Sequence, residues 1–353
     1  MGVDDPGTLV PIPMPVGASS NGRFGHADRV FTLRGTMLER DPASSRAPEP
    51  PVPVGACFGF EVKTDLSLTY LRDAGRTDGQ LAVREDVVEP VSEAIAPLRE
   101  WQPTDVNPFH ARLYAPHEDI ADRLWVRDLG WYAVDATAGE IVVPAGADPI
   151  RREERLWGIP ATLCFLARGD VPLHAAAVDI GGRALLFGAP GRHGKTTLAA
   201  AFHAAGHGLL SEDVSCLRVA PEPLVVPGPA MLRVRPDSFA HVDLPETREV
   251  GHDPDRVHLA LERSAPADPV GLAGVVLLRG TADSIDIRPE DPVEVVRDLW
   301  ALSFKVPTDA DRVRCFQALV DLAAAVPVWG LRRPMTFDTL RSVVDGVIER
   351  CLP

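Results

Sequence analysis

The chain has very little lysine. Only three of its 36 basic residues are lysines, at positions 63, 195 and 305. Basic residues are also outnumbered by 50 acidic ones, which leaves a net charge of −14. A chain of this charge lacks the basic field that attracts a phosphate backbone, so we expect no nucleic-acid partner.

Long apolar runs are absent as well. No stretch of 18 uncharged apolar residues occurs, so we expect no spanning helix and no membrane partner. The first residues, with Asp4, Asp5 and several prolines, contain no apolar core of a signal peptide. The five cysteines are scattered and none stands in a C-x-x-C pair, which is typical of reduced thiols. These absences predict a cytoplasmic protein, and the 45% apolar content is that of a globular chain.

What the chain does contain is an apolar run that ends in a glycine- and hydroxyl-rich loop, LLFGAPGRHGKTT, at residues 185–197. Residues 194–196, Gly-Lys-Thr, fit the end of the phosphate-loop pattern G-x-x-x-x-G-K-[ST]. Ala189 takes the first glycine position, and Arg192 stands where many such loops keep a glycine. Since lysine is so rare here, chance would place one at the required position in about one such loop in a hundred.

The surroundings of the loop favour a nucleotide site over an ordinary turn between a strand and a helix. Residues 183–187 read as a buried strand, and residues 196–205 read as a helix ended by Gly206. A phosphate would then lie at a helix N-terminus. The lysine would reach the terminal phosphates and the threonine hydroxyl would hold Mg²⁺. The residues expected to contact the nucleotide are Ala189, Pro190, Gly191, Arg192, His193, Gly194, Lys195, Thr196 and Thr197.

A histidine upstream of the loop is expected beside it. Two strand-like runs flank the glycine pair at 181–182, which suits a two-residue hairpin turn. That turn places Val178 opposite Leu185 and, by extension, His174 opposite Ala189. A histidine there can donate to phosphate or orient a neighbouring acid. A histidine bonded to a backbone carbonyl at a strand end is the alternative, and the hairpin alone does not choose between them.

An acidic pair follows the next expected strand, at residues 208–211. If that strand runs parallel to the one that feeds the loop, Glu212 and Asp213 emerge at the edge where open α/β sheets bind ligands. A carboxylate there can hold Mg²⁺ or accept a proton from an attacking hydroxyl. Adjacent residues of a strand point in opposite directions, so we expect the two acids to diverge. Ordinary surface charge is the alternative interpretation.

The texture of the chain indicates three regions. Residues 1–55, rich in proline, glycine and charge, are expected to be a tail or linker. Within this region, the most we expect is one edge strand at 29–35. Residues 56–160 are expected to form a small α/β module, and residues 161–353 a P-loop domain. The expected elements are a strand at 58–71, a helix at 86–101, strands around turns at 124–144, a bridging helix at 155–169, and core-facing helices within 291–304, 311–326 and 336–352.

Together these residues resemble the HPr kinase/phosphorylase superfamily. The shared features are a histidine before the loop (His174), the loop 189–196, a Gly-His pair ending at His207, and an acid at position 213. The offsets from the loop lysine to the histidine and to the acid are those of the family. The resemblance is specific over about 45 residues and weak over 170–353. Residues 56–155 also resemble the N-terminal part of HPr-kinase-related proteins of biosynthetic gene clusters.

The resemblance implies a P-loop kinase core of the HPr kinase type with a smaller N-terminal α/β module. It implies Lys195 on the β- and γ-phosphates, Thr196 on Mg²⁺, Asp213 as proton acceptor and His174 as an active-site partner. From its place in the acidic pair, Glu212 is the further candidate ligand of Mg²⁺. The family usually has two aspartates where this chain has Glu-Asp, and its downstream Glu-x-Arg-Gly motif is missing. Within 230–246, Asp237 is the one candidate replacement. These departures argue against HPr as substrate and against the reverse phosphorolysis.

We therefore expect a kinase that uses ATP and Mg²⁺ to phosphorylate a hydroxyl of a peptide or small-molecule natural-product intermediate. Two other classes remain open: a nucleotide-gated module that binds a peptide through residues 56–155, and an ATPase switch with no acceptor hydroxyl. The sequence names neither the acceptor nor a preference for ATP over GTP. It also leaves open whether the chain forms a homo-oligomer.

Overall fold

The computed structural model describes residues 53–73, 75–104, 108–115, 121–262, 267–304 and 308–352. Residues Pro50–Pro353 group into one compact unit. The expected tail or linker at 1–55 lies outside the described residues except for its last three positions, and so does the strand expected at 29–35. Among the described residues, no helix is both long and apolar enough to cross a membrane.

The first sheet is built from the N-terminal part of the unit. Its strands are β1 (Pro53–Cys57), β2 (Phe60–Lys63), β3 (Gly79–Asp86), β4 (Arg99–Trp101), β5 (Ala111–Tyr114), β6 (Asp122–Val126), β7 (Gly130–Asp135) and β8 (Glu140–Pro144). They lie in the order β1-β2-β3-β8-β7-β6-β5-β4. β3 is parallel to β2 and β8, and the other pairs are antiparallel. The strands expected within 124–144 are confirmed.

The prediction of a helix at 86–101 is wrong. Residue 86 ends β3, and the chain then runs without regular structure to β4. Pro90 and Pro97 explain the difference, because each removes a helix hydrogen bond and clashes with the preceding turn. The strand expected at 58–71 shortens to β2. After β2, the Thr64 hydroxyl accepts from the Leu66 backbone at 3.0 Å, which turns the chain.

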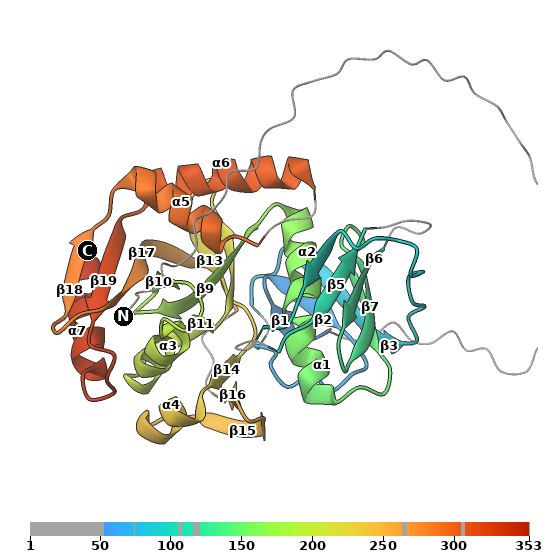
Figure 1. Ribbon diagram of the computed structural model, residues 1–353, viewed down its shortest axis with the longest axis horizontal. Helices are drawn as coiled ribbons and strands as arrows, with labels where there is room; N and C mark the ends of the chain where they lie inside the picture. The colour runs from blue at the N-terminus through green and yellow to red at the C-terminus, as the bar shows by residue number, and fades with distance from the viewer. Residues whose placement is uncertain are drawn as a thin grey trace, which may run out of the picture. The chain divides into compact units, whose positions relative to one another are not determined.

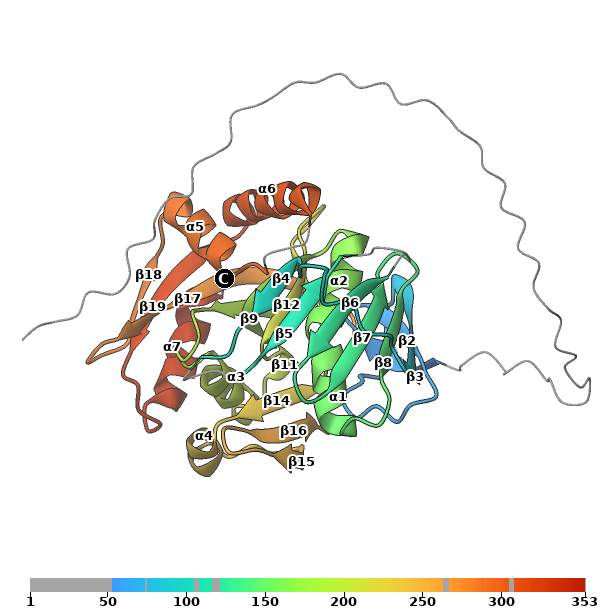
Figure 2. The same cartoon turned by 45° about the vertical axis from the view of Figure 1, so that its right-hand side comes forward.

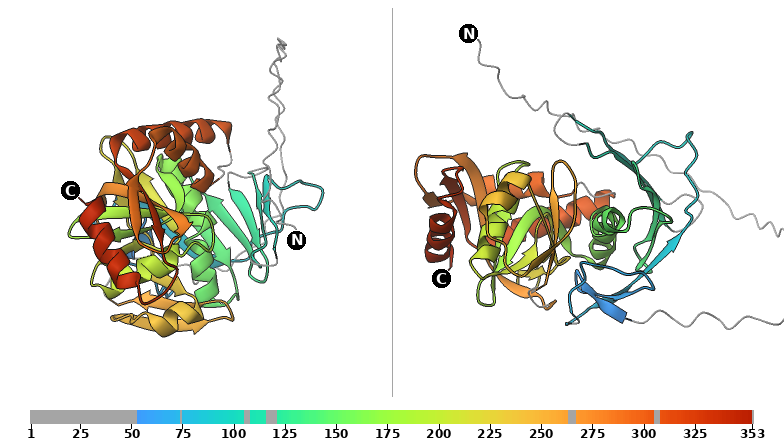
Figure 3. Two further views of the ribbon diagram at one scale, coloured as in Figure 1. Left: turned by 60° about the vertical axis from the view of Figure 1, so that its left-hand side comes forward. Right: turned by 90° about the horizontal axis from the view of Figure 1, so that it is seen from below.

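Two helices replace the single helix expected at 155–169. They are α1 (Pro149–Leu156) and α2 (Ile159–Arg168). Gly158 separates them with a non-helical backbone, and Pro160 stands in the first turn of α2, where its missing N–H costs nothing. Buried Leu156 and Phe165 of these helices pack against the first sheet. The right-hand view of Figure 3 shows the sheet curving around them.

The second sheet contains the loop-bearing strand. Its strands are β9 (Val171–Asp179), β10 (Arg183–Gly188), β11 (Gly208–Ser211), β12 (Val214–Arg218), β13 (Leu224–Val226), β17 (Val270–Thr281), β18 (Asp286–Pro289) and β19 (Val328–Arg333). The order is β10-β9-β12-β13-β17-β19-β18, with β11 also on β9 and β17 also on β10. β17 is parallel to both β10 and β19.

Helices cover both faces of this sheet (Figure 1). They are α3 (Lys195–Ala204) and α7 (Leu340–Cys351) on one face, and α5 (Pro292–Leu302) and α6 (Asp309–Ala325) on the other. The strand at 183–187, the helix at 196–205 and the three C-terminal helices expected from apolar spacing are thus confirmed. Together with the first sheet they make a mixed α/β fold.

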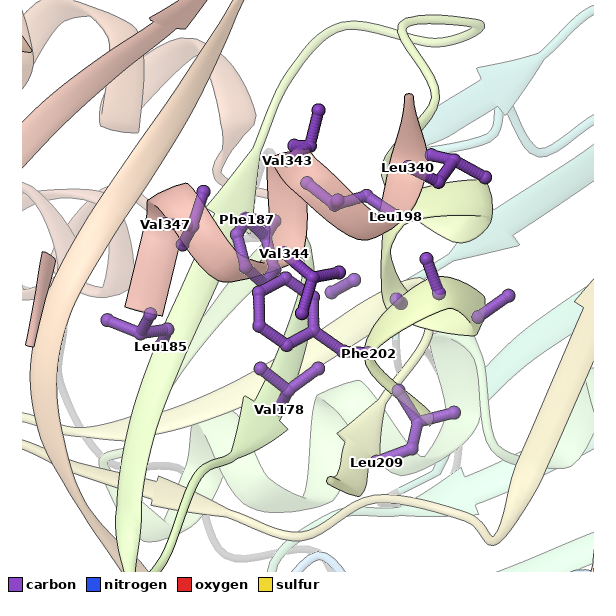
Figure 4. Close-up of a cluster of buried hydrophobic side chains, with 14 of the residues drawn as sticks. Val178, Leu185, Phe187, Leu198, Phe202, Leu209, Leu340, Val343, Val344 and Val347 are labelled. Atoms are coloured by element: carbon purple, nitrogen blue, oxygen red, sulfur yellow. The ribbon is translucent and has the colours of Figure 1, made fainter. Parts of the chain in front are cut away.

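Side chains of β10 point alternately to the two faces of the sheet, so the strand contributes to the hydrophobic core on each face. Leu185 and Phe187 join the cluster under α3 and α7, and Leu186 joins the cluster under α5 and α6. The ring centroids of Phe187 and Phe202 lie 5.1 Å apart. Figure 4 shows both rings in the cluster next to α7. Each such fully buried side chain contributes about 1.5–3 kcal/mol to folding. The loop after β10 therefore starts from a rigid base.

A third, three-stranded sheet consists of β14 (Met231–Val234), β15 (Thr247–His252) and β16 (Val257–Leu261), in the order β14-β16-β15. A short helix, α4 (Pro236–His241), follows β14. Leu259 of β16 packs with the core beneath α3, and its neighbour Ala260 packs with the core beneath α1 and α2. Figure 2 shows β14 and β16 beside α1. This sheet therefore joins the two larger parts.

Arg72 makes a second connection between the parts. Its side chain is buried and donates to the carbonyls of Gly228, Leu209 and Leu210 at 2.6, 2.8 and 3.0 Å. Burial lowers the pKa of this guanidinium to about 10. The segment after β2 is thereby tied to β11, which leads to the acidic pair.

Candidate functional site

The β9–β10 hairpin has the register expected from its glycine pair. Val178 pairs with Leu185, and the ladder ends at Ala175 and Gly188, so His174 comes next, across from Ala189. Gly181 and Gly182 have φ values of 63° and 83°, the left-handed backbone that a two-residue turn requires. The strand pairing therefore places His174 opposite Ala189, the first residue of the loop.

The acidic pair reaches the same edge through β9. β11 is antiparallel to β9, as β10 is, so β11 and β10 run in the same direction, as expected. Residues 212–213 form the bend from β11 into β12, and Val214 of β12 pairs with His174. This pairing places Asp213 next to the histidine.

The two acids do not diverge, contrary to the expectation. Both contact Arg233 of β14: its Nε donates to Glu212 Oε2 at 3.0 Å and its Nη2 donates to Asp213 Oδ2 at 3.2 Å. The residues lie in a bend rather than on a strand, so strand alternation does not apply to them.

The loop between β10 and α3 turns through two positive-φ residues, Arg192 at 66° and Gly194 at 79°. A side chain at Gly194 would be strained by this φ, and Arg333, at the end of β19, would have to shift, because its Nη2 would lie 2.6 Å from the added Cβ. Ala189 is buried, whereas Pro190 and Gly191 are exposed. The His193 ring bonds back to the Gly191 carbonyl at 2.9 Å. The N-terminus of α3, with its unpaired backbone N–H groups, therefore opens beside an exposed loop.

Lys195 lies buried at the start of α3. Its Nζ donates to the Ala189 carbonyl at 2.7 Å and to the Pro190 carbonyl at 3.3 Å, and it lies 3.0 Å from His174 Nε2. Burial lowers the pKa of this ammonium, while Asp213 and Glu212 act in the opposite sense. The ammonium has only hydrogens to offer, so His174 Nε2 accepts from it.

The tautomer of His174 follows from that contact. With Nε2 as acceptor, the ring hydrogen is on Nδ1, which lies 3.1 Å from Asp213 Oδ1 and donates to it. A continuous chain thus runs from Lys195 through His174 to Asp213. The sequence left open whether the histidine contacts phosphate, the neighbouring acid or a backbone carbonyl, and in the structure it contacts the acid.

Asp213 is held as an anion. Burial raises its pKa, but the hydrogen bond from His174 and the charges of Arg233 and Lys195 outweigh burial and hold the pKa well below the usual range. Its side chain is 42% exposed, so it remains open to an incoming molecule. This carboxylate has a low affinity for protons.

Thr196 and Glu212 provide two oxygens where a metal ion is expected. The Thr196 hydroxyl donates to Glu212 Oε1 at 3.1 Å. No group of three or more His, Cys, Asp or Glu that could hold a metal occurs in the described part of the chain. Mg²⁺ suits so small a set, because it keeps several waters and takes phosphate oxygens as ligands. The residues present therefore fit Mg²⁺ bound together with a nucleotide.

The remaining expected residues lie nearby with other contacts. Thr197 shares a hydrogen bond of 3.0 Å with Ser238 at the start of α4. Asp237 accepts from the Ser238 backbone at 2.7 Å, and no contact of its carboxylate with the loop or the acidic pair is found among the described residues. The His207 ring packs on Phe202, 5.7 Å between centroids.

Sequence reasoning missed Arg233, although it lies in the segment 230–246 that was searched for a carboxylate. It also missed a buried network behind it: His258 of β16 bonds to Glu154 of α1 and, at 3.2 Å, to Asp253. The hydrogen bond to Glu154 is the main reason that the pKa of His258 is raised. An arginine or histidine that pairs across three elements leaves no local pattern, so no spacing rule could have found these residues.

No protein-family model and no curated protein matches the chain. Among solved structures, the chain is similar to the Hpr(Ser) kinase/phosphatase from Coxiella burnetii, with 12% identity and a TM-score of 0.28 over 50% of this chain and 93% of that one. So distant a likeness assigns no role to any residue. The site is therefore characterised only by its own geometry, that of the loop, His174 and the acidic pair.

Proposed function

We propose that the protein is a kinase that transfers the terminal phosphate of ATP, in the presence of Mg²⁺, to a hydroxyl group. The acceptor we propose is a peptide or small-molecule intermediate of natural-product biosynthesis, in line with the resemblance of the N-terminal part. One observation supports this most strongly. Asp213 is partly exposed beside the loop and is joined through His174 to the loop lysine.

The contacts support the following roles. The N–H groups of residues 191–196 and Lys195 hold the phosphates, and the lysine exchanges its carbonyl partners for phosphate oxygens. Thr196 and Glu212 hold Mg²⁺, which offsets phosphate charge when bound. Asp213 orients the acceptor hydroxyl. It takes the hydroxyl proton as the new oxygen–phosphorus bond forms and the bond to the ADP oxygen breaks.

The weak basicity of Asp213 is compatible with this role. Phosphoryl transfer passes through a loose transition state in which the hydroxyl keeps its proton until late. A strong base is therefore unnecessary, and a fixed, ionised hydrogen-bond acceptor suffices. His174 positions that carboxylate and links its charge to Lys195.

The test is nucleotide binding and single-turnover phosphate transfer by the purified chain and its Lys195→Ala variant. We expect the variant to remain folded and to lose transfer, since the lysine acts on phosphate charge. Lys63→Ala is the matched control, because Lys63 bonds to Gln80 at the surface. Normal transfer by Lys195→Ala would remove the loop from the mechanism.

The same measurements separate the two alternatives. An ATPase switch hydrolyses ATP without any acceptor and leaves inorganic phosphate as its only phosphorylated product besides ADP. A nucleotide-gated binding module binds ATP and releases no ADP. Either result would contradict the kinase proposal.

A further inference from the structure

A small cavity opens directly beside Asp213. Its charged lining residues are Glu154 and Arg155 from the end of α1, Glu212 and Asp213 from the β11–β12 bend, and Arg233 from β14. Met231 and Trp157 are among its other lining residues. Its volume is ≈ 50 Å³. A single water needs about 10–15 Å³ on this measure, so a few non-hydrogen atoms fit. The cavity admits the reactive end of a molecule and not a whole drug-sized ligand.

Arg155 is the unusual residue of this lining. Its guanidinium lies 4.7 Å from the centre of the Phe109 ring. No hydrogen bond or ion pair of this guanidinium occurs within the part of the chain that the structure describes. Arg233, by contrast, is satisfied by both carboxylates of the acidic pair. The cavity thus contains one arginine that is neutralised and one that is available.

The three carboxylates that line the cavity have other partners: Glu154 bonds to His258, and Glu212 and Asp213 contact Arg233. Burial lowers the pKa of Arg155, and the nearby positive charge of Arg233 adds to that effect; Glu154, Tyr132 and Asp213 act in the opposite sense. A partly buried cation that has an aromatic contact but no hydrogen-bond acceptor or ion-pair partner is stabilised when an anion binds it. The planar fork of a guanidinium matches a carboxylate in two parallel hydrogen bonds.

We propose that Arg155 binds a carboxylate of the acceptor, so that the phosphorylated group is the hydroxyl of a hydroxy acid. This inference rests on the proposed kinase function. The hydroxyl lies at Asp213 and the carboxylate at Arg155, both of which line the same cavity. The size of the cavity keeps the two groups a few atoms apart. The N-terminal part of the chain, through α1, thereby supplies a binding residue for the acceptor.

A carboxylate probe and its neutral counterpart test this directly. The full chain, loaded with Mg²⁺ and a non-hydrolysable ATP analogue, is titrated with glycerate or with glyceramide into tens of millimolar, and the melting temperature is measured. We expect glycerate to raise the melting temperature and glyceramide to have no effect. With MgATP, we expect glycerate to accelerate ADP release over the amide.

Variants of α1 assign the effect to one residue. We expect Arg155→Met to weaken glycerate binding about 10- to 100-fold, the loss of one charged hydrogen-bonding pair. The melting-temperature shift caused by the nucleotide analogue should remain. Arg155→Lys should keep part of the glycerate effect. Arg151→Met, an exposed arginine on the same helix, is the matched control and should behave like the unaltered chain.

The outcomes separate this inference from the function on which it rests. Equal responses to glycerate and glyceramide, or full glycerate binding by Arg155→Met, would overturn the carboxylate site while leaving the kinase proposal intact. A glycerate shift that needs Arg155, without nucleotide binding or transfer, would support the carboxylate site and overturn the kinase proposal.

Discussion

Asp213 combines two properties that rarely meet in one carboxylate: it is open to solvent at the mouth of a loop, and it is surrounded by cationic groups. His174 and Arg233 each contact one of its oxygens. The resulting low proton affinity means that its contribution comes from position and charge. This is the residue on which the distinction between a kinase and a nucleotide switch depends.

Replacing Asp213 by asparagine should leave nucleotide affinity nearly unchanged and slow transfer by about 10²–10⁴-fold, the usual loss for a missing general base. The amide keeps the shape of the side chain but cannot take the proton. Single-turnover transfer and nucleotide titration measure the two effects separately. A collapse of binding with a normal transfer rate would show that the residue holds the metal ion instead.

Arg233 should set the pH range of that chemistry. Since the pKa of Asp213 is lowered, its ionised form persists in the native chain until the pH falls well below the usual carboxylate range. Arg233→Met removes one source of the lowering, so the acid limb of the transfer rate should move to higher pH. Arg233→Lys, which keeps the charge, should shift it less. An unshifted acid limb in the methionine variant would refute this role.

At the residue scale, the sequence predicts the groups tied to a local pattern. Lys195 and Thr196 follow from the loop motif, and His174 follows from the hairpin. Arg233 and Arg155 could not be predicted, because each acts on Asp213 or on the cavity from a distant element. Their positions depend on how β14 and α1 pack, which no sequence spacing encodes.

At the scale of elements, the two-residue turn of the β9–β10 hairpin fixes where His174 lies. Gly182 has a φ of 83° and open space around its Cα. We expect Gly182→Ala to lower the free energy of unfolding by about 1–2 kcal/mol through backbone strain alone. Gly271→Ala is the control, since that glycine also has open space but no positive φ. Chemical denaturation measures both, and equal effects would contradict the strain argument.

The elements also show where pattern reasoning works and where it fails. Helices α5, α6 and α7 were predictable because their apolar residues recur along one face. The segment 86–101 has helix-like apolar spacing as well, but Val87 is 75% exposed and two prolines interrupt it. There the breaker residues outweigh the periodicity. The separation of α1 from α2 follows the same rule at Pro160.

At the scale of the whole molecule, Arg72 ties the N-terminal part to β11. Arg72→Met should cost about 3–5 kcal/mol of unfolding free energy, because buried carbonyls lose charged donors. Arg76→Met, an exposed arginine on the same segment, should cost little. Urea denaturation followed by tryptophan fluorescence measures both variants. A similar stability for the two would mean that the apolar contacts alone join the parts.

The His258–Glu154 pair, between β16 and α1, makes the stability of the junction between the two parts sensitive to pH. The pKa of His258 is raised in the folded chain, so its stabilising contribution is complete below the unfolded value, about 6.5, and is lost as pH rises through the folded value. We expect the difference in unfolding free energy between the unaltered chain and His258→Gln to shrink from pH 6 to pH 9. A difference that does not change with pH would rule out a charged histidine in this pair.

Because lysine is scarce in this chain, the lysine of the site can be labelled selectively by an amine-reactive reagent. The chain has three lysine amines, and the one at position 195 is buried against Ala189 and His174. An acyl-phosphate derivative of ATP delivers its acyl group to an amine that contacts the phosphates. On this chain it should acylate Lys195, with little acylation elsewhere because only two other lysines are present. Mass spectrometry of one modified peptide would then report nucleotide occupancy in intact cells, before any acceptor is identified.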